Sequence, residues 1–331
     1  MKHFGQSETL TPFLDSLYTR SISFRNFYSA GIHTNHGLYA TLYSFPAMMK
    51  RNLMKGSVIP RYSGLPTVLK ENGYYNLFFM THEGQYDNMN AFFRTNGYDE
   101  VFSQEDYPAD KVVNSFGVQD DFLYDYAIPV LNQRAATGQP FFATLLSISN
   151  HPPYVIPPFF HPKTSEPEMQ IVEYADWALR QFFEEARKQP WFDNTIFVLE
   201  GDHGKLVGDA ECELPESYNH IPLMIYSSRI QPEEKTAFGG QVDIQPTILG
   251  LLNIDYLQNN FGVDLLKEER PCMFYTADNM IVGRNDTLLY LYNYETQQEL
   301  TYDIGNGKLN AVPMDDSFFP LKEYSFSMLQ S

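Results

Sequence analysis

Short apolar runs alternate with amphipathic segments over most of the chain. The runs are rich in Phe, Leu, Ile and Val and end at polar or glycine residues, which is the pattern of buried strands. They cover residues 22–28, 76–81, 141–147 and 195–200. The segments between them repeat apolar residues at helical spacing, as at Tyr174, Ala178 and Phe182, so we predict that they form helices. The expected helices cover residues 11–19, 65–72, 88–95, 119–136, 170–188 and 246–252.

This order of elements predicts an α/β fold in which a mostly parallel sheet is flanked by helices. After residue 265 the pattern changes to short alternating segments joined by Asn-Asp and Gly-Asn turns, which is typical of antiparallel strands. We expect these strands at residues 272–277, 280–284, 287–293 and 299–303. The sequence therefore predicts a main domain over residues 1–265 and a small C-terminal α+β subdomain over residues 266–331 packed on it.

The composition is that of a globular protein. Of 331 residues, 43% are hydrophobic and 15% are aromatic, which is enough for a large core. The sequence has no apolar run of the roughly eighteen residues that a membrane span needs and no signal peptide, so we expect the chain as given to be soluble. Cys212 and Cys272 form neither a disulfide framework nor a metal-ligand spacing, which leaves the redox compartment open.

The formal net charge of −18 excludes some classes of partner. Nucleic-acid binding needs basic patches, and the sequence shows no cluster of Lys and Arg. The same balance gives no attraction to an anionic membrane surface. A bound cation together with several histidines can still attract an anion into one cleft. The acidic balance therefore does not exclude an anionic substrate, and we expect no nucleic-acid partner, with no protein partner implied.

Asp202 and His203 follow directly after the strand predicted at 195–200, with a glycine on each side. In an open α/β sheet, ligands bind at the carboxyl ends of the strands, and the glycines allow a sharp turn that points both side chains at one ion. The alternative is an ordinary loop in which Asp202 forms an Asx-turn and His203 is solvated.

Thr34 follows another apolar run, in a segment that is rich in Gly, Asn and His. Coordination to a divalent cation makes a hydroxyl a usable nucleophile near neutral pH, and the amides of a following helix attract an anionic group. The alternative is that Thr34 only caps that helix. The pairing of this segment with the Asp-His turn favours both roles together.

These motifs resemble the lipoteichoic-acid-synthase-like, sulfatase-related branch of the alkaline phosphatase superfamily. The resemblance runs over most of the chain, and several blocks in one order are more specific than any one of them. The blocks are residues 10–17, the Thr34 segment, and residues 73–82, 86–89, 96–99, 149–154, 201–204 and 242–249.

The resemblance implies roles for five side chains. Thr34 would take a phosphoryl or phosphoglycerol group covalently, and Thr34, Asp202 and His203 would bind one divalent metal ion, Mn²⁺ first, with Mg²⁺ or Zn²⁺ as alternatives. His82 and His151 would bind phosphate oxygens or donate a proton to a leaving alkoxide. Both histidines come directly after predicted strands, which favours a pocket over a solvated loop.

Three further residues have a candidate substrate-binding role, and each also has a structural explanation. Asp87 and Asn88 would, by family analogy, hydrogen-bond a glycerol hydroxyl, or else cap the helix that follows them. His220 precedes another apolar run and either points at the pocket or has a structural role. His33 and His36 flank Thr34, and we assign neither a catalytic role.

The chain departs from the family at its start. Family members begin this domain with an apolar strand that ends in a metal-binding Glu, whereas this sequence opens already past it. Glu8 is the nearest carboxylate, but it lies in a predicted loop, and we do not assign it to the metal. Either the sequence starts late or the protein has lost the strand. Both explanations predict weak metal binding or an empty site, and an open position in the sheet.

Within the superfamily, we predict a metal-dependent phosphoglycerol transferase or phosphodiesterase that acts on lipid headgroups or cell-envelope glycans. Relatives usually carry transmembrane helices ahead of this domain, which places a full-length form on the extracytoplasmic side of the membrane. Formylglycine sulfatases match poorly, because they need Cys or Ser followed by x-Pro-x-Arg at the nucleophile position. The alternatives are a sulfuric-ester or phosphate-ester hydrolase, and a catalytically degenerate domain that only binds a glycan or headgroup.

Overall fold

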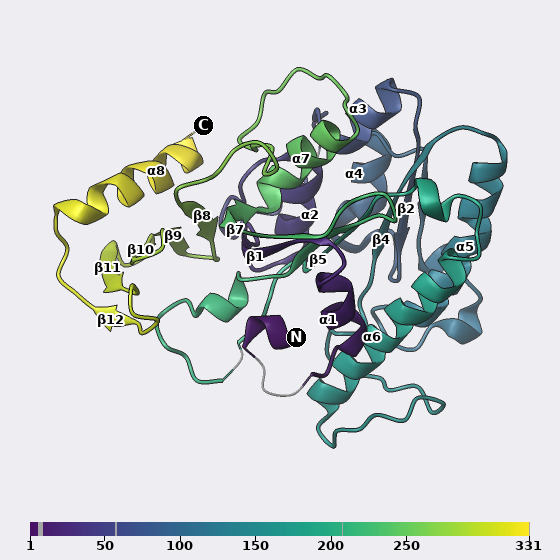
Figure 1. Ribbon diagram of the computed structural model, residues 1–331, viewed down its shortest axis with the longest axis horizontal. Coiled ribbons are helices and arrows are strands. Elements are labelled where there is room, and N and C mark those ends of the chain that lie inside the picture. The colour runs from purple at the N-terminus through teal and green to yellow at the C-terminus, as the bar shows by residue number, and fades with distance from the viewer. Residues whose placement is uncertain (6–8, 57, 207, 331) are drawn as a thin grey trace.

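Two sheets form the centre of the larger part of the molecule, with helices on both sides (Figure 1). The computed structural model describes residues 1–331 except 6–8, 57, 207 and 331. Glu8 therefore lies outside the described residues. Neighbouring strands are parallel except at β6, which runs antiparallel to β5 and β1. The first sheet has the order β5 (Phe197–Glu200), β6 (Leu223–Tyr226), β1 (Ile22–Tyr28), β7 (Glu233–Gly240), and the second has the order β3 (Glu100–Phe102), β2 (Tyr75–Met80), β4 (Phe141–Leu146).

The helices divide between the two faces as the alternation along β2 requires. Leu77 and Phe79 pack in a core with α1, α5 and α6, whereas Phe78 and Met80 point the other way and pack with α2 and α4. Helices α3 and α7 cover β1 on that second face. The bounds are α1 (Pro12–Tyr18), α2 (Thr34–Tyr43), α3 (Leu65–Glu71), α4 (Met89–Thr95), α5 (Asp120–Ala136), α6 (Pro167–Ala186) and α7 (Ile244–Leu251).

Among the described residues, the two sheets are not joined by a hydrogen-bonded ladder, and β4 and β5 each pair on one side only. Both edges border the same cores, because Phe141 and Phe197 belong to one and Phe142 and Ile196 to another. Yet β4 is only partly buried up to Leu145, and Val198 in β5 is 36% exposed. Apolar strands of a parallel sheet are normally covered. The open sheet position that the sequence predicts stays a prediction.

The C-terminal part is an antiparallel sheet covered by helix α8 (Phe319–Gln330) (Figure 1). It contacts the larger part through Tyr275, whose ring stacks on Tyr28 with centroids 5.5 Å apart, and through the Thr276 amide, which donates to the Ala30 carbonyl at 2.9 Å. Its strands lie in the order β12 (Asn310–Ala311), β11 (Gln298–Asp303), β10 (Leu288–Asn293), β9 (Met280–Arg284), β8 (Met273–Thr276).

The predicted α/β class and the C-terminal antiparallel sheet are confirmed. Helix α6 begins three residues before the predicted start, at Pro167, because proline is well tolerated in the first turn of a helix. Cys212 and Cys272 are free thiols. Within the part of the chain that the structure describes, no helix is both long and apolar enough to cross a membrane.

Candidate functional site

Thr34, Asp202 and His203 meet at the carboxyl end of β5. The Thr34 hydroxyl donates a hydrogen bond to Asp202 Oδ2 at 2.7 Å, and His203 Nε2 lies 3.6 Å from the same oxygen. The other ring nitrogen, Nδ1 of His203, hydrogen-bonds with the Gly204 carbonyl at 2.8 Å, which orients the ring. Residues that are 168 positions apart in the chain therefore share one carboxylate oxygen. The sequence predicted this convergence.

Local structure explains why Thr34 faces the turn. His33 is the N-cap of α2 and Thr34 is its first helical residue, so Thr34 does not cap the helix. Three residues on, Gly37 brings the helix against the turn: a Cβ at that position would lie 2.5 Å from the Asp202 carbonyl oxygen. Two turns after Thr34, the Thr41 hydroxyl donates to Glu200 Oε1 at 2.6 Å. Helix α2 is thus hydrogen-bonded through Thr41 to the last residue of β5 and through Thr34 to the turn that follows it.

Two titratable groups beside these residues are shifted by burial. Desolvation raises the pKa of the Glu200 carboxyl to about 8, although the hydrogen bond from Thr41 lowers it. Burial also lowers the pKa of His36 to about 4, with a smaller contribution in the same direction from His33. His36 is therefore a neutral imidazole near pH 7.

The three converging side chains fit one divalent cation as an incomplete set of ligands. Two ligands of one ion at about 2.1 Å lie roughly 3.0–3.6 Å apart, and the His203–Asp202 separation of 3.6 Å is at the upper end of that range. Hydroxyl, carboxylate and imidazole suit Mn²⁺, Mg²⁺ or Zn²⁺. Among the described residues, no group of three or more His, Cys, Asp or Glu side chains is arranged to hold a metal. The structure thus brings together two such side chains, Asp202 and His203, with the Thr34 hydroxyl.

His82 and His151 lie on one wall of rings beside the site. The His82 ring is 4.7 Å from Tyr86, Tyr86 is 6.3 Å from Phe116, and Phe116 is 4.0 Å from His151, all between ring centroids. Burial lowers the pKa of His82, which favours its neutral form. Phe116 and His151 also line a small hollow with Val113. The loop before Gly117 is pressed on the end of β2, since a Cβ at Gly117 would lie 1.8 Å from the Thr81 carbonyl.

Asp87 and Asn88 form a strained turn that reaches the Thr34 segment. Both have positive φ, 51° and 62°, which is costly for residues with a Cβ. Asp87 Oδ2 accepts a hydrogen bond from Asn35 Nδ2 at 3.3 Å, and its other oxygen pairs with Lys55 Nζ at 2.6 Å. Asn88 is the N-cap of α4, but its side chain donates to the Met54 carbonyl and makes no cap hydrogen bond. The structure therefore places Asp87 in contact with Asn35, the residue that follows the candidate nucleophile.

His220 is held by contacts away from the metal-ligand group. Its Nε2 hydrogen-bonds with the Arg25 carbonyl at 2.6 Å, and its ring stacks on Tyr28 with centroids 5.0 Å apart. Its other nitrogen lies 3.8 Å from Glu216. These contacts favour the structural alternative for His220 over a pocket role.

The sequence did not single out Lys55, Phe116 or Lys205. The Lys205 ammonium donates to the Tyr154 hydroxyl at 3.1 Å. This hydrogen bond connects the segment after the Asp-His turn to the loop that carries His151. Lys205 was detectable as the first cation after the Gly-flanked pair. Lys55 and Phe116 come from long irregular segments, and no periodic pattern marks them.

Fold and site together define a protein of alkaline phosphatase-like α/β architecture. A solved structure of an alkaline phosphatase superfamily protein from Vibrio parahaemolyticus matches it with a TM-score of 0.86 and 28% identity, over 97% of this chain and 81% of that chain. The family model for sulfatases matches residues 1–254. The chain belongs to the sulfatase family, and within the alkaline phosphatase superfamily it is lipoteichoic-acid-synthase-like.

Two similar proteins carry names that bear on chemistry. Lipoteichoic acid synthase 1 from Bacillus subtilis (strain 168) is 26% identical over 270 residues, covering 75% of this chain and 40% of that protein. Phosphoglycerol transferase I from Xanthomonas campestris pv. campestris is 25% identical over 295 residues, covering 83% of this chain and 42% of that protein. The chain thus spans less than half the length of these relatives.

Proposed function

We propose that this chain is the catalytic domain of a metal-dependent phosphoglycerol transferase or phosphodiesterase. The substrate is a phospholipid headgroup or an envelope glycan, and a full-length form works on the extracytoplasmic side of the membrane. The observation that carries the proposal is the hydrogen bond from the Thr34 hydroxyl to the carboxylate of the Asp-His turn. The names of the relatives support the reaction class. We also propose the division into residues 1–265 and 266–331.

Thr34 is the nucleophile in this proposal. Its Oγ forms a bond to phosphorus, the bond from phosphorus to the leaving alkoxide breaks, and the hydroxyl proton passes to Asp202, which already accepts it in a hydrogen bond. A divalent ion held by Thr34, Asp202 and His203 supplies charge neutralisation and a lowered hydroxyl pKa when bound. The first helical turn of α2 directs its free amides toward the anionic group.

Two histidines of the row of rings formed by His82, Tyr86, Phe116 and His151 have separate roles in this proposal. His151, in the loop after β4, donates a proton to the leaving alkoxide, and His82 binds a phosphate oxygen. An acceptor alcohol or water then attacks phosphorus and gives its proton to His151, while the bond from phosphorus to Thr34 Oγ breaks and Asp202 returns its proton to Thr34. Asp87, beside Asn35, hydrogen-bonds a hydroxyl of the glycerol.

The test combines three chromogenic substrates with a search for the adduct. The full chain is incubated at millimolar Mn²⁺ with bis(4-nitrophenyl) phosphate, 4-nitrophenyl phosphate or 4-nitrophenyl sulfate, and with phosphatidylglycerol in mixed micelles. We expect turnover of the diester above both monoesters, and a phosphorus-containing mass shift on the Thr34 peptide that Thr34→Ala abolishes. Preferred sulfate or monoester turnover would instead support the hydrolase alternatives. Binding of phosphatidylglycerol without Mn²⁺ binding or turnover would support the degenerate binding domain.

A further inference from the structure

Gln241 is a buried amide that joins the two segments carrying Thr34 and Asp202. It lies in the 3₁₀ turn η7 (Gln241–Asp243) directly after β7, and its relative exposure is 0%. Its Oε1 accepts a hydrogen bond from the Ala30 amide at 2.8 Å. Its Nε2 donates to the Asp202 carbonyl at 2.8 Å and to the Gly201 carbonyl at 3.2 Å. One side chain therefore bonds the loop before α2 to the turn after β5.

Helix α2 leaves no spare room at this junction. A Cβ on Gly37 would lie 2.9 Å from Gln241 Nε2 and 2.5 Å from the Asp202 carbonyl oxygen. The helix, the Asp-His turn and the amide are thus in direct contact, with no side chain between them. A displacement of the amide has to move at least one of the two segments that it bonds.

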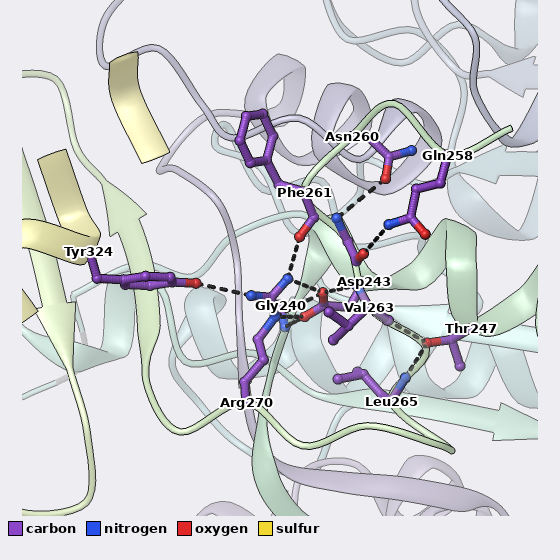
Figure 2. Close-up of polar contacts among 11 residues, drawn as sticks. Gly240, Asp243, Thr247, Gln258, Asn260, Phe261, Val263, Leu265, Arg270 and Tyr324 are labelled. Atoms are coloured by element: carbon purple, nitrogen blue, oxygen red, sulfur yellow. Dashed lines mark hydrogen bonds and ion pairs between the residues drawn. The ribbon is translucent and has the colours of Figure 1, made fainter. Parts of the chain in front are cut away.

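The turn that carries Gln241 is itself fixed by a buried ion pair, shown in Figure 2. The Asp243 side chain is 0% exposed and that of Arg270 is 9% exposed. Arg270 Nε donates to Asp243 Oδ2 at 2.8 Å, and the same oxygen accepts from the Gly240 amide at 2.9 Å. Arg270 Nη1 also donates to the Tyr324 hydroxyl of α8 at 3.0 Å. The backbone on both sides of Gln241 is therefore held in one position.

We propose that Gln241 is a positioning residue for the metal-ligand group. Its three hydrogen bonds set the separation between the Thr34 hydroxyl and the Asp202 carboxylate, which metal coordination and in-line attack require to within about 0.5 Å. Through Arg270 and Tyr324, the C-terminal part of the chain supports that separation. The role in catalysis rests on the proposed function, whereas the coupling of the two segments does not.

The experiment compares Gln241→Met and Gln241→Glu with a matched control, Gln245→Met. Met keeps the length of the side chain without its hydrogen bonds, and Glu keeps the acceptor for Ala30 but presents an oxygen to the two carbonyls. Gln245 lies in α7, is 1% exposed, and its Oε1 has no hydrogen-bond partner among the described residues. The control therefore removes a buried amide that does not bond either site segment.

Three measurements are made on the full chain. Amide hydrogen exchange is followed for residues 29–37 and 199–205, Mn²⁺ affinity is measured by calorimetry with the metal alone, and kcat and KM are measured with bis(4-nitrophenyl) phosphate. We expect both Gln241 variants to exchange faster in the two segments together, to bind Mn²⁺ about 10–100-fold more weakly, and to lose kcat by a similar factor with KM within about 2-fold. Gln245→Met should match the unsubstituted chain in all three.

The exchange measurement separates this inference from the proposed function. Unchanged exchange in either segment of both Gln241 variants, or equal effects of Gln245→Met, would overturn the positioning role. If the unsubstituted chain neither binds Mn²⁺ nor turns over the diester, the proposed function fails, and coupled exchange in the Gln241 variants still supports the coupling of the two segments.

Discussion

Replacing Gly37 by alanine tests whether the direct contact of α2 with the Asp-His turn matters for chemistry. The added Cβ would lie 2.5 Å from the Asp202 carbonyl oxygen, so the backbone there must retreat by about 0.9 Å to reach an ordinary contact of roughly 3.4 Å. Misplacement by about 1 Å costs on the order of 100-fold in rate. Alanine favours a helix over glycine by about 0.8–1.0 kcal/mol, which offsets part of an overpacking cost of about 1–3 kcal/mol. The fold should therefore survive while activity falls.

The assay measures diester turnover, Mn²⁺ affinity and unfolding by urea for Gly37→Ala and for a control, Gly250→Ala in α7. The nearest atoms to a Cβ at Gly250 would belong to the Asp264 and Lys267 side chains rather than to backbone, so side-chain movement can relieve the contact. We expect Gly37→Ala to lose about 100-fold in kcat and at least about 10-fold in Mn²⁺ affinity, with an unfolding free energy within about 2 kcal/mol of the unsubstituted chain. Gly250→Ala should keep both activity and affinity. Wild-type turnover by Gly37→Ala would refute the reasoning.

Three further predictions concern stability and substrate binding. Burial alone would raise the pKa of Glu216, but Arg284, the Tyr28 hydroxyl and His220 together lower it below its ordinary value of 4.5. A lowered carboxyl pKa stabilises the fold above that ordinary value and loses the contribution as the pH falls through the lowered pKa. The melting temperature of the unsubstituted chain should thus fall more steeply below pH 4.5 than that of Glu216→Gln, and parallel curves would contradict this. Thr41→Val should cost about 1–3 kcal/mol in urea unfolding near pH 7, because the protonated Glu200 carboxyl group loses the hydrogen bond from Thr41, and an unchanged midpoint would count against that bond. Phe116→Ala should raise KM for phosphatidylglycerol several-fold at unchanged melting temperature. An unchanged KM would contradict the proposal that Phe116 and the rings beside it contact the substrate.

The sequence predicted the strands that carry the site, because each is an apolar run with a sharp polar end. It also predicted that Thr34 and the Asp-His turn would converge, since both follow strands whose carboxyl ends meet at one edge. Strand β7 was missed: its sequence, Glu-Glu-Lys-Thr-Ala-Phe-Gly-Gly, is polar over its first half and so shows neither alternation nor a continuous apolar run. Only its parallel pairing with β1 makes it a strand.

Contacts between distant segments could not be predicted from the sequence for a different reason. Gln241 and Arg270 act through hydrogen bonds to partners that are tens to hundreds of positions away, and a buried Gln or Arg has no local pattern that reveals its partner. The sequence predicted a C-terminal α+β subdomain but not the position of helix α8, because the apolar face of this helix is recognisable only against the C-terminal sheet that it covers. The roles assigned to His82, His151, Asp87, Asn88 and His220 stay predictions.

The central claim is that the Thr34 hydroxyl, the Asp202 carboxylate and the His203 imidazole bind one divalent ion. Anomalous X-ray diffraction at the manganese edge, from crystals soaked in millimolar MnCl₂, tests it most directly. The account predicts a single peak at about 2.0–2.4 Å from Thr34 Oγ1, Asp202 Oδ2 and His203 Nε2, with an occupancy that rises with the MnCl₂ concentration because binding is weak. No peak at saturating Mn²⁺, or a peak that excludes Thr34, would contradict it.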